Sequence, residues 1–350
     1  MCLQNRVLFR IIPVLALLIM TAAGQAQDIH FSQYYASPFN LNPALAGCFD
    51  GDYRFILNQR TQWRSVTVPY NTFGLSADAS DLNPSPLAHN EVLEQLGGAL
   101  SFYSDRAGDS RLSTTQFQLA LSYALPLQPG ANAHIVPGIM IGLHRTGIDY
   151  SELNYDNQWN GLFFDPSLDA GESYARDART YADLGLGVVY YAQSGRRDRT
   201  EAGISMLNLN APTQSWFNMS GVKLDTRFNI HGRHRMAVKD EIDIEPTLLF
   251  MKQGSYREFS IGALGYYILD DQRGLFRSVY GGFQGRARDA GYVVAGMEYD
   301  NWNVGISYDI NTSNLKPASR GRGGFEFSVI YVLRRPDLRL TPPKVCPDYL

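Results

Sequence analysis

Two runs between Trp302 and Leu333 alternate between apolar residues and residues that are mostly small or polar. The first run is Trp302–Asn311, and the second is Phe325–Leu333. Successive side chains of a strand point to opposite faces, so each run predicts a ribbon with one apolar, aromatic-rich face. About ten tilted residues span the hydrocarbon core of a bilayer. Strands of a soluble β-sandwich are usually shorter, and their outer face carries more charge. The pattern favours a membrane β-barrel, with the soluble sandwich as the alternative.

Similar runs recur through the chain and predict an all-β, antiparallel transmembrane barrel of the outer membrane with about 14 strands. An even strand number is typical of bacterial barrels whose two termini lie on one side. The composition agrees, because 21 Tyr, 18 Phe and 32 Gly with only 19% charged residues suit aromatic girdles and small lumen-facing positions. The expected strands are Tyr53–Gln62, Tyr70–Asp78, Gly97–Asp105, Thr114–Leu125, Ala133–Thr146, Tyr181–Gln193, Thr200–Asn208, Thr226–Val238, Ile242–Gln253, Arg257–Leu269, Phe276–Arg286, Ala290–Tyr299 and the two opening runs.

The first residues read as an export signal. A basic start with Arg6 and Arg10, the apolar run IIPVLALLIM and the small-x-small sequence GQA predict a signal peptide over residues 1–26. An N-terminal membrane anchor is the alternative, but the apolar run is shorter than the ~20 residues that a spanning helix needs. The rest divides into a periplasmic leader segment (27–51), the barrel (52–334) and a short periplasmic C-terminal tail (335–350). Both termini of the mature chain are expected in the periplasm, because the longer connections then face outward.

The leader has no regular period but carries several aromatic residues, so we expect it to dock on the barrel instead of forming a strand. Its prolines and asparagines suit turns and caps. We expect it to be a partner-binding surface or a cap on the periplasmic side, and simple sealing of the barrel base is the competing interpretation. The candidate residues are Phe31, Ser32, Gln33, Tyr34, Asn40, Asn42, Pro43 and Gly47.

A second set of candidates belongs to the lumen or the outer mouth of the barrel: Asp309, Asn311, Ser313 and Glu326. Alternation places Asp309 and Asn311 on the lumen side, and Ser313 begins the following loop. A buried carboxylate needs a partner, so we expect Asp309 and Glu326 to bond to Arg or Tyr across the interior.

The cysteines Cys48 and Cys346 flank the predicted barrel and form a possible disulfide. The first and last strands of a closed barrel are neighbours, so both residues should emerge at one rim, in a compartment that permits disulfides. Unpaired thiols, or one cysteine that serves a partner, are the alternatives.

No catalytic, metal or cofactor site is predicted. His231 and His234 are the only close histidines, and at this spacing on a strand they point to opposite faces. There is no CxxC pair and no nucleophile elbow. A net charge of −3 argues against nucleic acid as a partner. The expected partners are the lipid bilayer around the barrel wall and a protein that binds the leader segment.

Five stretches, taken in order, resemble the successive signatures of the PorP/SprF family. They are DIHFSQYYASPFNLNPALAG, NQRTQW, LNYDNQWNG, GISMLNLNAPTQSW and GISYDINTSNLKPASRGRGGFEFSVIY. The Cys346-Pro347 pair is similar to the usual tail, whereas Asp348-Tyr349-Leu350 departs from its commoner basic-aromatic ending.

The resemblance implies a non-enzymatic outer-membrane component of the type IX secretion and gliding system of Bacteroidetes-type bacteria. Such a component supports export and surface attachment of specific cargo, such as large adhesins, and contacts other components of the machine. The alternative function is a transport barrel that passes a small solute.

Overall fold

The structure, a computed structural model, describes residues 29–62, 68–82, 95–108, 110–128, 132–150, 153–171, 177–194, 197–216, 221–272, 275–287, 289–312 and 322–334. The predicted signal peptide, the C-terminal tail, Ser313 and Cys346 lie outside these ranges.

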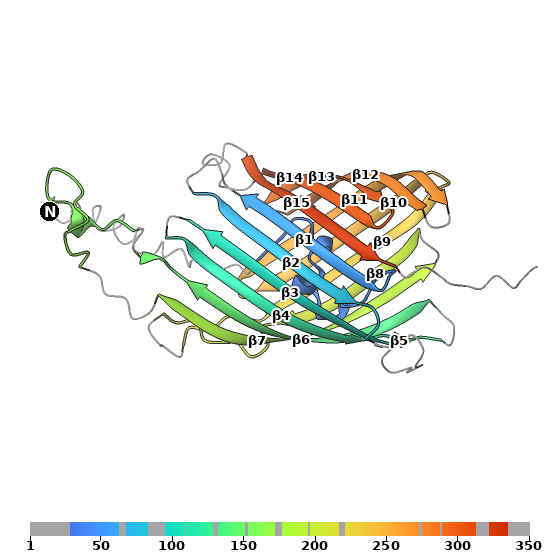
Figure 1. Ribbon diagram of the computed structural model, residues 1–350, viewed down its shortest axis with the longest axis horizontal. Coiled ribbons are helices and arrows are strands. Elements are labelled where there is room, and N and C mark those ends of the chain that lie inside the picture. The colour runs from blue at the N-terminus through green and yellow to red at the C-terminus, as the bar shows by residue number, and fades with distance from the viewer. Residues whose placement is uncertain are drawn as a thin grey trace, which may run out of the picture.

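Antiparallel strands of the described chain form one closed barrel of 14 strands (Figure 1). Strand β1 pairs with β15 at the seam, and β4 pairs with β6. A two-residue strand, β5 (Leu125–Pro126), pairs with the start of β6. The predicted fold class is therefore confirmed, and the predicted strand ends are close to those observed. The wall consists of β1 (Tyr53–Gln62), β2 (Tyr70–Ala79), β3 (Leu96–Ala107), β4 (Leu112–Tyr123), β6 (Ala133–Gly147), β7 (Ala178–Ser194), β8 (Asp198–Leu207), β9 (Arg227–Lys239), β10 (Ile242–Gln253), β11 (Tyr256–Gln272), β12 (Leu275–Arg286), β13 (Ala290–Tyr299), β14 (Trp302–Asn311) and β15 (Arg322–Leu333).

Alternation along each strand separates an apolar outer face from a polar inner face. On β10, Ile244 is 40% exposed, whereas its neighbours Asp243 and Glu245 are 0% and 1% exposed. On β15, Phe325 is 50% exposed and Glu326 only 1%. Apolar side chains thus cover the outside, where a bilayer solvates them, and charged side chains fill the interior. No helix in the described ranges is long and apolar enough to cross a membrane.

The barrel has two unlike ends. One end, here called the loop end, carries the long connections between β6 and β7 and between β8 and β9. The other, the turn end, carries the start of β1 and the end of β15, where the Asp52 N–H donates to the Leu333 carbonyl at 2.9 Å. Figure 1 shows the loop end on the left.

The segment that precedes β1 lies inside the barrel, where Figure 1 shows it as dark blue coils. It consists of η1 (Tyr34–Ala36), α2 (Pro38–Leu41) and η2 (Pro43–Leu45). Proline occupies the first turn of α2 and of η2, where its missing N–H costs nothing. The Asn42 side chain caps η2 by accepting the Ala44 N–H at 3.0 Å. The segment therefore consists of short helical turns, and it forms no strand, as its lack of a regular period predicts.

The position of this segment differs from the predicted cap on the periplasmic side of the barrel. The segment runs along the lumen, because its polar and aromatic side chains complement the inner wall. Ile29 lies near the loop end, and Phe49 lies near the turn end, next to β1. The described chain accordingly begins at one end of the barrel and finishes, at Arg334, at the other. The termini of the mature chain lie outside the described ranges, so the expectation that both are periplasmic stays a prediction.

Candidate functional site

Residues Ile29–Cys48, here called the plug segment, occupy the lumen and are almost entirely buried. Inward-facing side chains of several strands bind the plug segment at three places. The leader residues singled out from the sequence belong to it, and we take these three places from the loop end to the turn end.

The first place joins Ser32 and Gln33 to the seam of the barrel. Their backbone N–H groups donate to the two carboxylate oxygens of Glu326 on β15, at 2.7 and 2.9 Å. The Ser32 hydroxyl donates to the Asp309 carboxylate on β14 at 2.8 Å. Arg60 of β1 compensates both acids: its Nη2 lies 2.9 Å from Asp309 Oδ2 and its Nε 3.8 Å from Glu326 Oε2. A buried carboxylate tolerates burial only with such partners.

The Gln33 side chain extends the same contact. Its Oε1 accepts a hydrogen bond from the Ser328 hydroxyl at 2.8 Å, and its Nε2 donates to Ser307 Oγ at 3.3 Å. A Cβ at Gly305 would lie only 2.6 Å from Gln33 Oε1, so a side chain there would displace the Gln33 amide from its present position. Predicted lumen residues and predicted leader residues therefore meet in one site. Asn311, also predicted, is buried at the loop end of β14.

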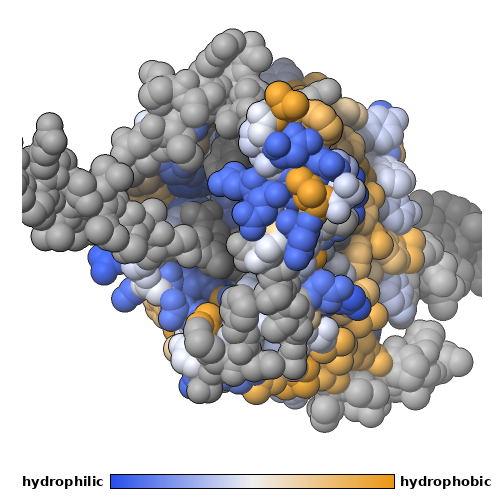
Figure 2. Space-filling model, turned by 90° about the vertical axis from the view of Figure 1, so that its left-hand side faces the viewer, coloured by the Kyte–Doolittle hydropathy of each residue, from blue (hydrophilic) through white to orange (hydrophobic). Residues whose placement is uncertain are grey.

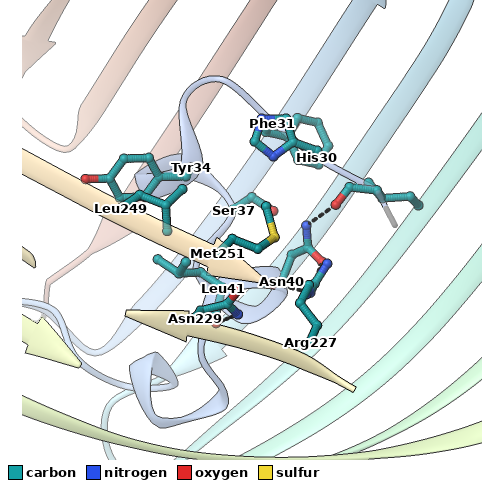
Figure 3. Close-up of a pocket in the computed structure, with 11 residues that line it drawn as sticks. His30, Phe31, Tyr34, Ser37, Asn40, Leu41, Arg227, Asn229, Leu249 and Met251 are labelled. Atoms are coloured by element: carbon teal, nitrogen blue, oxygen red, sulfur yellow. Dashed lines mark hydrogen bonds between the residues drawn. The ribbon is translucent and has the colours of Figure 1, made fainter. Parts of the chain in front are cut away.

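The second place lies around Asn40 and Leu41, and Figure 3 shows Arg227 and Asn229 of β9 reaching toward it. Arg227 Nη2 donates to the Asn40 carbonyl at 2.6 Å and to Asn40 Oδ1 at 2.9 Å. The Leu41 carbonyl accepts from Asn229 Nδ2 at 2.8 Å and from the Ser205 hydroxyl at 2.6 Å. Carbonyl groups that no regular structure pairs are thus satisfied by the wall.

Asn42 fits a recess in the wall that lacks side chains. Its Nδ2 donates to the Ile204 carbonyl at 3.0 Å and lies 3.2 Å from His231 Nε2. A Cβ at Gly187 would overlap the Asn42 side-chain oxygen, and a Cβ at Gly203 would lie 2.8 Å from Nδ2. The glycines of β7 and β8 therefore make this insertion possible.

The third place holds Gly47 at the turn end. Its N–H donates to Asp78 Oδ2 at 2.9 Å, and Arg54 binds the same carboxylate through Nε and Nη2 at 2.9 and 2.8 Å. Arg54 also donates to the Leu45 carbonyl at 3.3 Å. Gly47 has φ +73°, and a Cβ there would lie 3.0 Å from the Ala79 carbonyl oxygen. Both facts require glycine at the exit from the plug segment.

Apolar contacts close the remaining space. Tyr34, Leu41, Ala44 and Leu45 pack together with wall residues such as Val136. Pro43, also among the predicted leader residues, lies beside Gly187 of the wall. A cavity of about 20 Å³ remains beside Phe31, Tyr34 and Asn40 (Figure 3). It has room for about one water molecule. The plug segment consequently fills much of the middle of the barrel.

Cys48 is buried at the turn-end side of the plug segment. Its thiol donates to the Ala44 carbonyl at 3.2 Å. Burial raises the pKa of the Cys48 thiol well above its ordinary value, so the thiol stays protonated. Cys346 lies outside the described residues, so the predicted bridge stays a prediction.

Above the plug segment, a cavity of about 790 Å³ lies at the loop end; we call it the vestibule. Ile29 and His30 form part of its floor. Figure 2 looks onto this end and shows hydrophilic residues around a hollow, with hydrophobic residues along the flank. Its walls include Arg60, Thr72, Asp105, Gln116, Arg179, Tyr181, Gln214, Trp216, Tyr256, Arg257, Glu258, Arg286, Asp289, Asp309 and Asn311.

Sequence analysis did not single out several wall residues that hold the plug segment, among them Arg54, Arg60, Asp78, Arg227 and Asn229. Each occupies an inward position of a strand, and alternation indicates that. Alternation does not indicate which residue each of these side chains binds, because contacts such as that between Ser32 and Asp309 join residues 277 positions apart. Among the described residues, no group of three or more His, Cys, Asp or Glu side chains could hold a metal ion.

Comparison with known proteins identifies the family. The profile described as "Type IX secretion system membrane protein PorP/SprF" matches residues 23–331. No curated protein matches the chain.

Solved structures with similar folds include the toluene transporter TodX of Pseudomonas putida, with 8% identity and a TM-score of 0.44 over 88% of this chain and 95% of that one. CdiB from Escherichia coli has 8% identity and a TM-score of 0.42 over 81% of this chain and 63% of that one. These values are too low to indicate function. The family match covers most of the sequence, and the chain belongs to the PorP/SprF family of type IX secretion system membrane proteins.

Proposed function

We propose that this barrel is a non-enzymatic outer-membrane component of the type IX secretion system that supports export and surface attachment of specific cargo, such as large adhesins. On this proposal the barrel holds cargo, or the machinery that delivers it, and does not conduct the cargo through its own lumen. The observation that carries the proposal is the occupied lumen, because the plug segment fills it with Phe31, Ser32, Gln33, Phe39 and Asn42, each at most 2% exposed.

The proposal includes the orientation of the barrel in the outer membrane. Long connections of bacterial outer-membrane barrels face outward, so the loop end and the vestibule face the exterior. The turn end, with the start of β1 and the end of β15, then faces the periplasm. Secreted adhesin-type cargo would meet the loop end, and periplasmic secretion components would meet the turn end. The plug segment separates the two compartments.

Conductance tests this function against the alternative of a solute-transport barrel. We expect purified protein in planar bilayers to form no stable ohmic channel, and a variant that lacks residues 29–47 to form one. Heat-modifiable migration on a denaturing gel shows whether each protein is a folded barrel. Stable ohmic conductance by the parent protein would support transport and contradict our proposal.

A cellular experiment addresses cargo. Cells without this protein should lose surface display of one large secreted protein, while other cargo of the same system is still exported. Re-expression of the parent chain should restore display. Normal display of every cargo without the protein would overturn the proposed role.

A further inference from the structure

The arginines of the vestibule differ in how their charge is compensated. Arg60 pairs with Asp309 at 2.9 Å, and Arg286 pairs with Asp289 at 2.8 Å. Arg179, near the loop end of β7, has no such partner: its Nε and Nη1 are buried and make no hydrogen bond. No carboxylate of the described residues lies within ion-pair distance of it. A buried donor without an acceptor costs stability, so it requires an explanation, and a ligand that supplies the acceptor is one.

The Arg179 guanidinium is nevertheless held in place. Its Cζ lies 4.8 Å from the centre of the Trp216 ring, a cation–π contact. The nearby Tyr181 hydroxyl accepts a hydrogen bond from Gln214 Nε2 at 3.5 Å, and the Tyr181 ring stacks on His144 at 5.1 Å. Arg179, Tyr181, Gln214 and Trp216 all line the vestibule. A charged donor thus stands on an ordered aromatic support beside an open cavity.

We propose that the vestibule binds a carboxylate-bearing ligand, with Arg179 on Trp216 as its anchor. A planar guanidinium matches a carboxylate in shape and charge, and stacking on an aromatic ring orients it in advance. The cavity volume of about 790 Å³ suits a small molecule or the end of a peptide. The argument for this site does not use the proposed role in secretion, because it depends only on residues that line the vestibule.

Two sources offer this chemistry, the free C-terminus of a polypeptide and an acidic sugar, and binding measurements separate them. The purified full-length barrel in detergent is titrated with N-acetyl-trialanine and its C-terminal amide, and with D-glucuronate and D-glucose. We expect at least one acid to bind about ten- to a hundredfold more tightly than its neutral counterpart, as for a hydrogen bond to a charged group. The member of the pair that binds identifies the source.

Variants then assign the binding to Arg179. Arg179→Gln should remove the preference for the acid, Arg179→Lys should restore part of it, and Trp216→Leu should weaken it. Arg111→Gln is the matched control, because Arg111 lies in a turn of the loop end, is half exposed and does not line the vestibule. Heat-modifiable gel migration checks that each variant is folded. The proposal would be overturned if acid and neutral probes bound with equal affinity, or if neither acid bound at millimolar concentration. It would also be overturned if folded Arg179→Gln kept the preference for the acid.

Discussion

Replacement of Glu326 by Gln tests how the plug segment is held. The carboxylate accepts the N–H groups of Ser32 and Gln33, one on each oxygen, at 2.7 and 2.9 Å. A glutamine has the same shape but only one acceptor oxygen. One of the two N–H groups would therefore face an NH₂ group, which also donates.

The size of the effect follows from those two bonds. A hydrogen bond to a charged acceptor contributes about 1.5–3 kcal/mol, and a buried N–H left without an acceptor costs about 1–3 kcal/mol. The loss near Ser32 and Gln33 should thus be about 3 kcal/mol. Since about 1.4 kcal/mol corresponds to a factor of ten, the locally open state should become roughly a hundredfold more populated.

Hydrogen–deuterium exchange measures the population of the locally open state at the backbone N–H groups of Ser32 and Gln33. Peptides that cover residues 29–37 should exchange about a hundredfold faster in Glu326→Gln than in the parent barrel. The control is Glu298→Gln, because Glu298 bonds Arg235 and Ser278 of the wall and should leave the segment protected. Unchanged exchange of Ser32 and Gln33 in a folded Glu326→Gln barrel would refute the reasoning.

Three further outcomes are expected. Gly187→Ala should displace Asn42 and speed exchange across the middle of the plug segment, whereas a serine-to-alanine change on the outer face should not. In a Cys346→Ser background, Cys48 should resist alkylation at pH 8 until the barrel is denatured, because burial raises the pKa of its thiol and alkylation requires the thiolate; rapid labelling of the native barrel would contradict this. Asp309→Ala should lower the melting temperature, since it leaves the buried Arg60 without its closest carboxylate, a loss of about 3–5 kcal/mol; a melting temperature equal to the parent's would count against that pairing.

Much of the barrel is predictable because the direction of a strand side chain depends only on its position along the chain. Alternation depends only on a residue and its nearest neighbours along the chain, so the lipid-facing position of Phe325 and the inward position of Glu326 follow from the pattern alone. Strand number follows from the turns between such runs. These properties need no knowledge of which strands pair.

The location of the leader was not predictable in the same way. Its aromatic residues and prolines indicate that it packs against something, but the choice between the rim and the lumen depends on the space inside the closed wall. That space is set by inward glycines such as Gly187 and Gly203, each of which looks in the sequence like any small lumen residue. Only the assembled barrel shows that they form the recess for Asn42.

The contact of Ser32 and Gln33 also bears on the order of folding. Ser32 and Gln33 bond to β14 and β15, and the nearby His30 carbonyl accepts a hydrogen bond from Arg60 of β1. The segment therefore meets the first strand and the last two on either side of the seam. The pairing of β1 with β15 joins Tyr53 to Leu333 and is a slow, high-entropy step, because most of the chain separates the partners. The plug segment precedes the strands in the chain and contacts both edge strands. It would therefore bring β1 and β15 together before they pair, and it would already lie in the lumen when the barrel closes. Assembly of the barrel without residues 29–47 should consequently be slower.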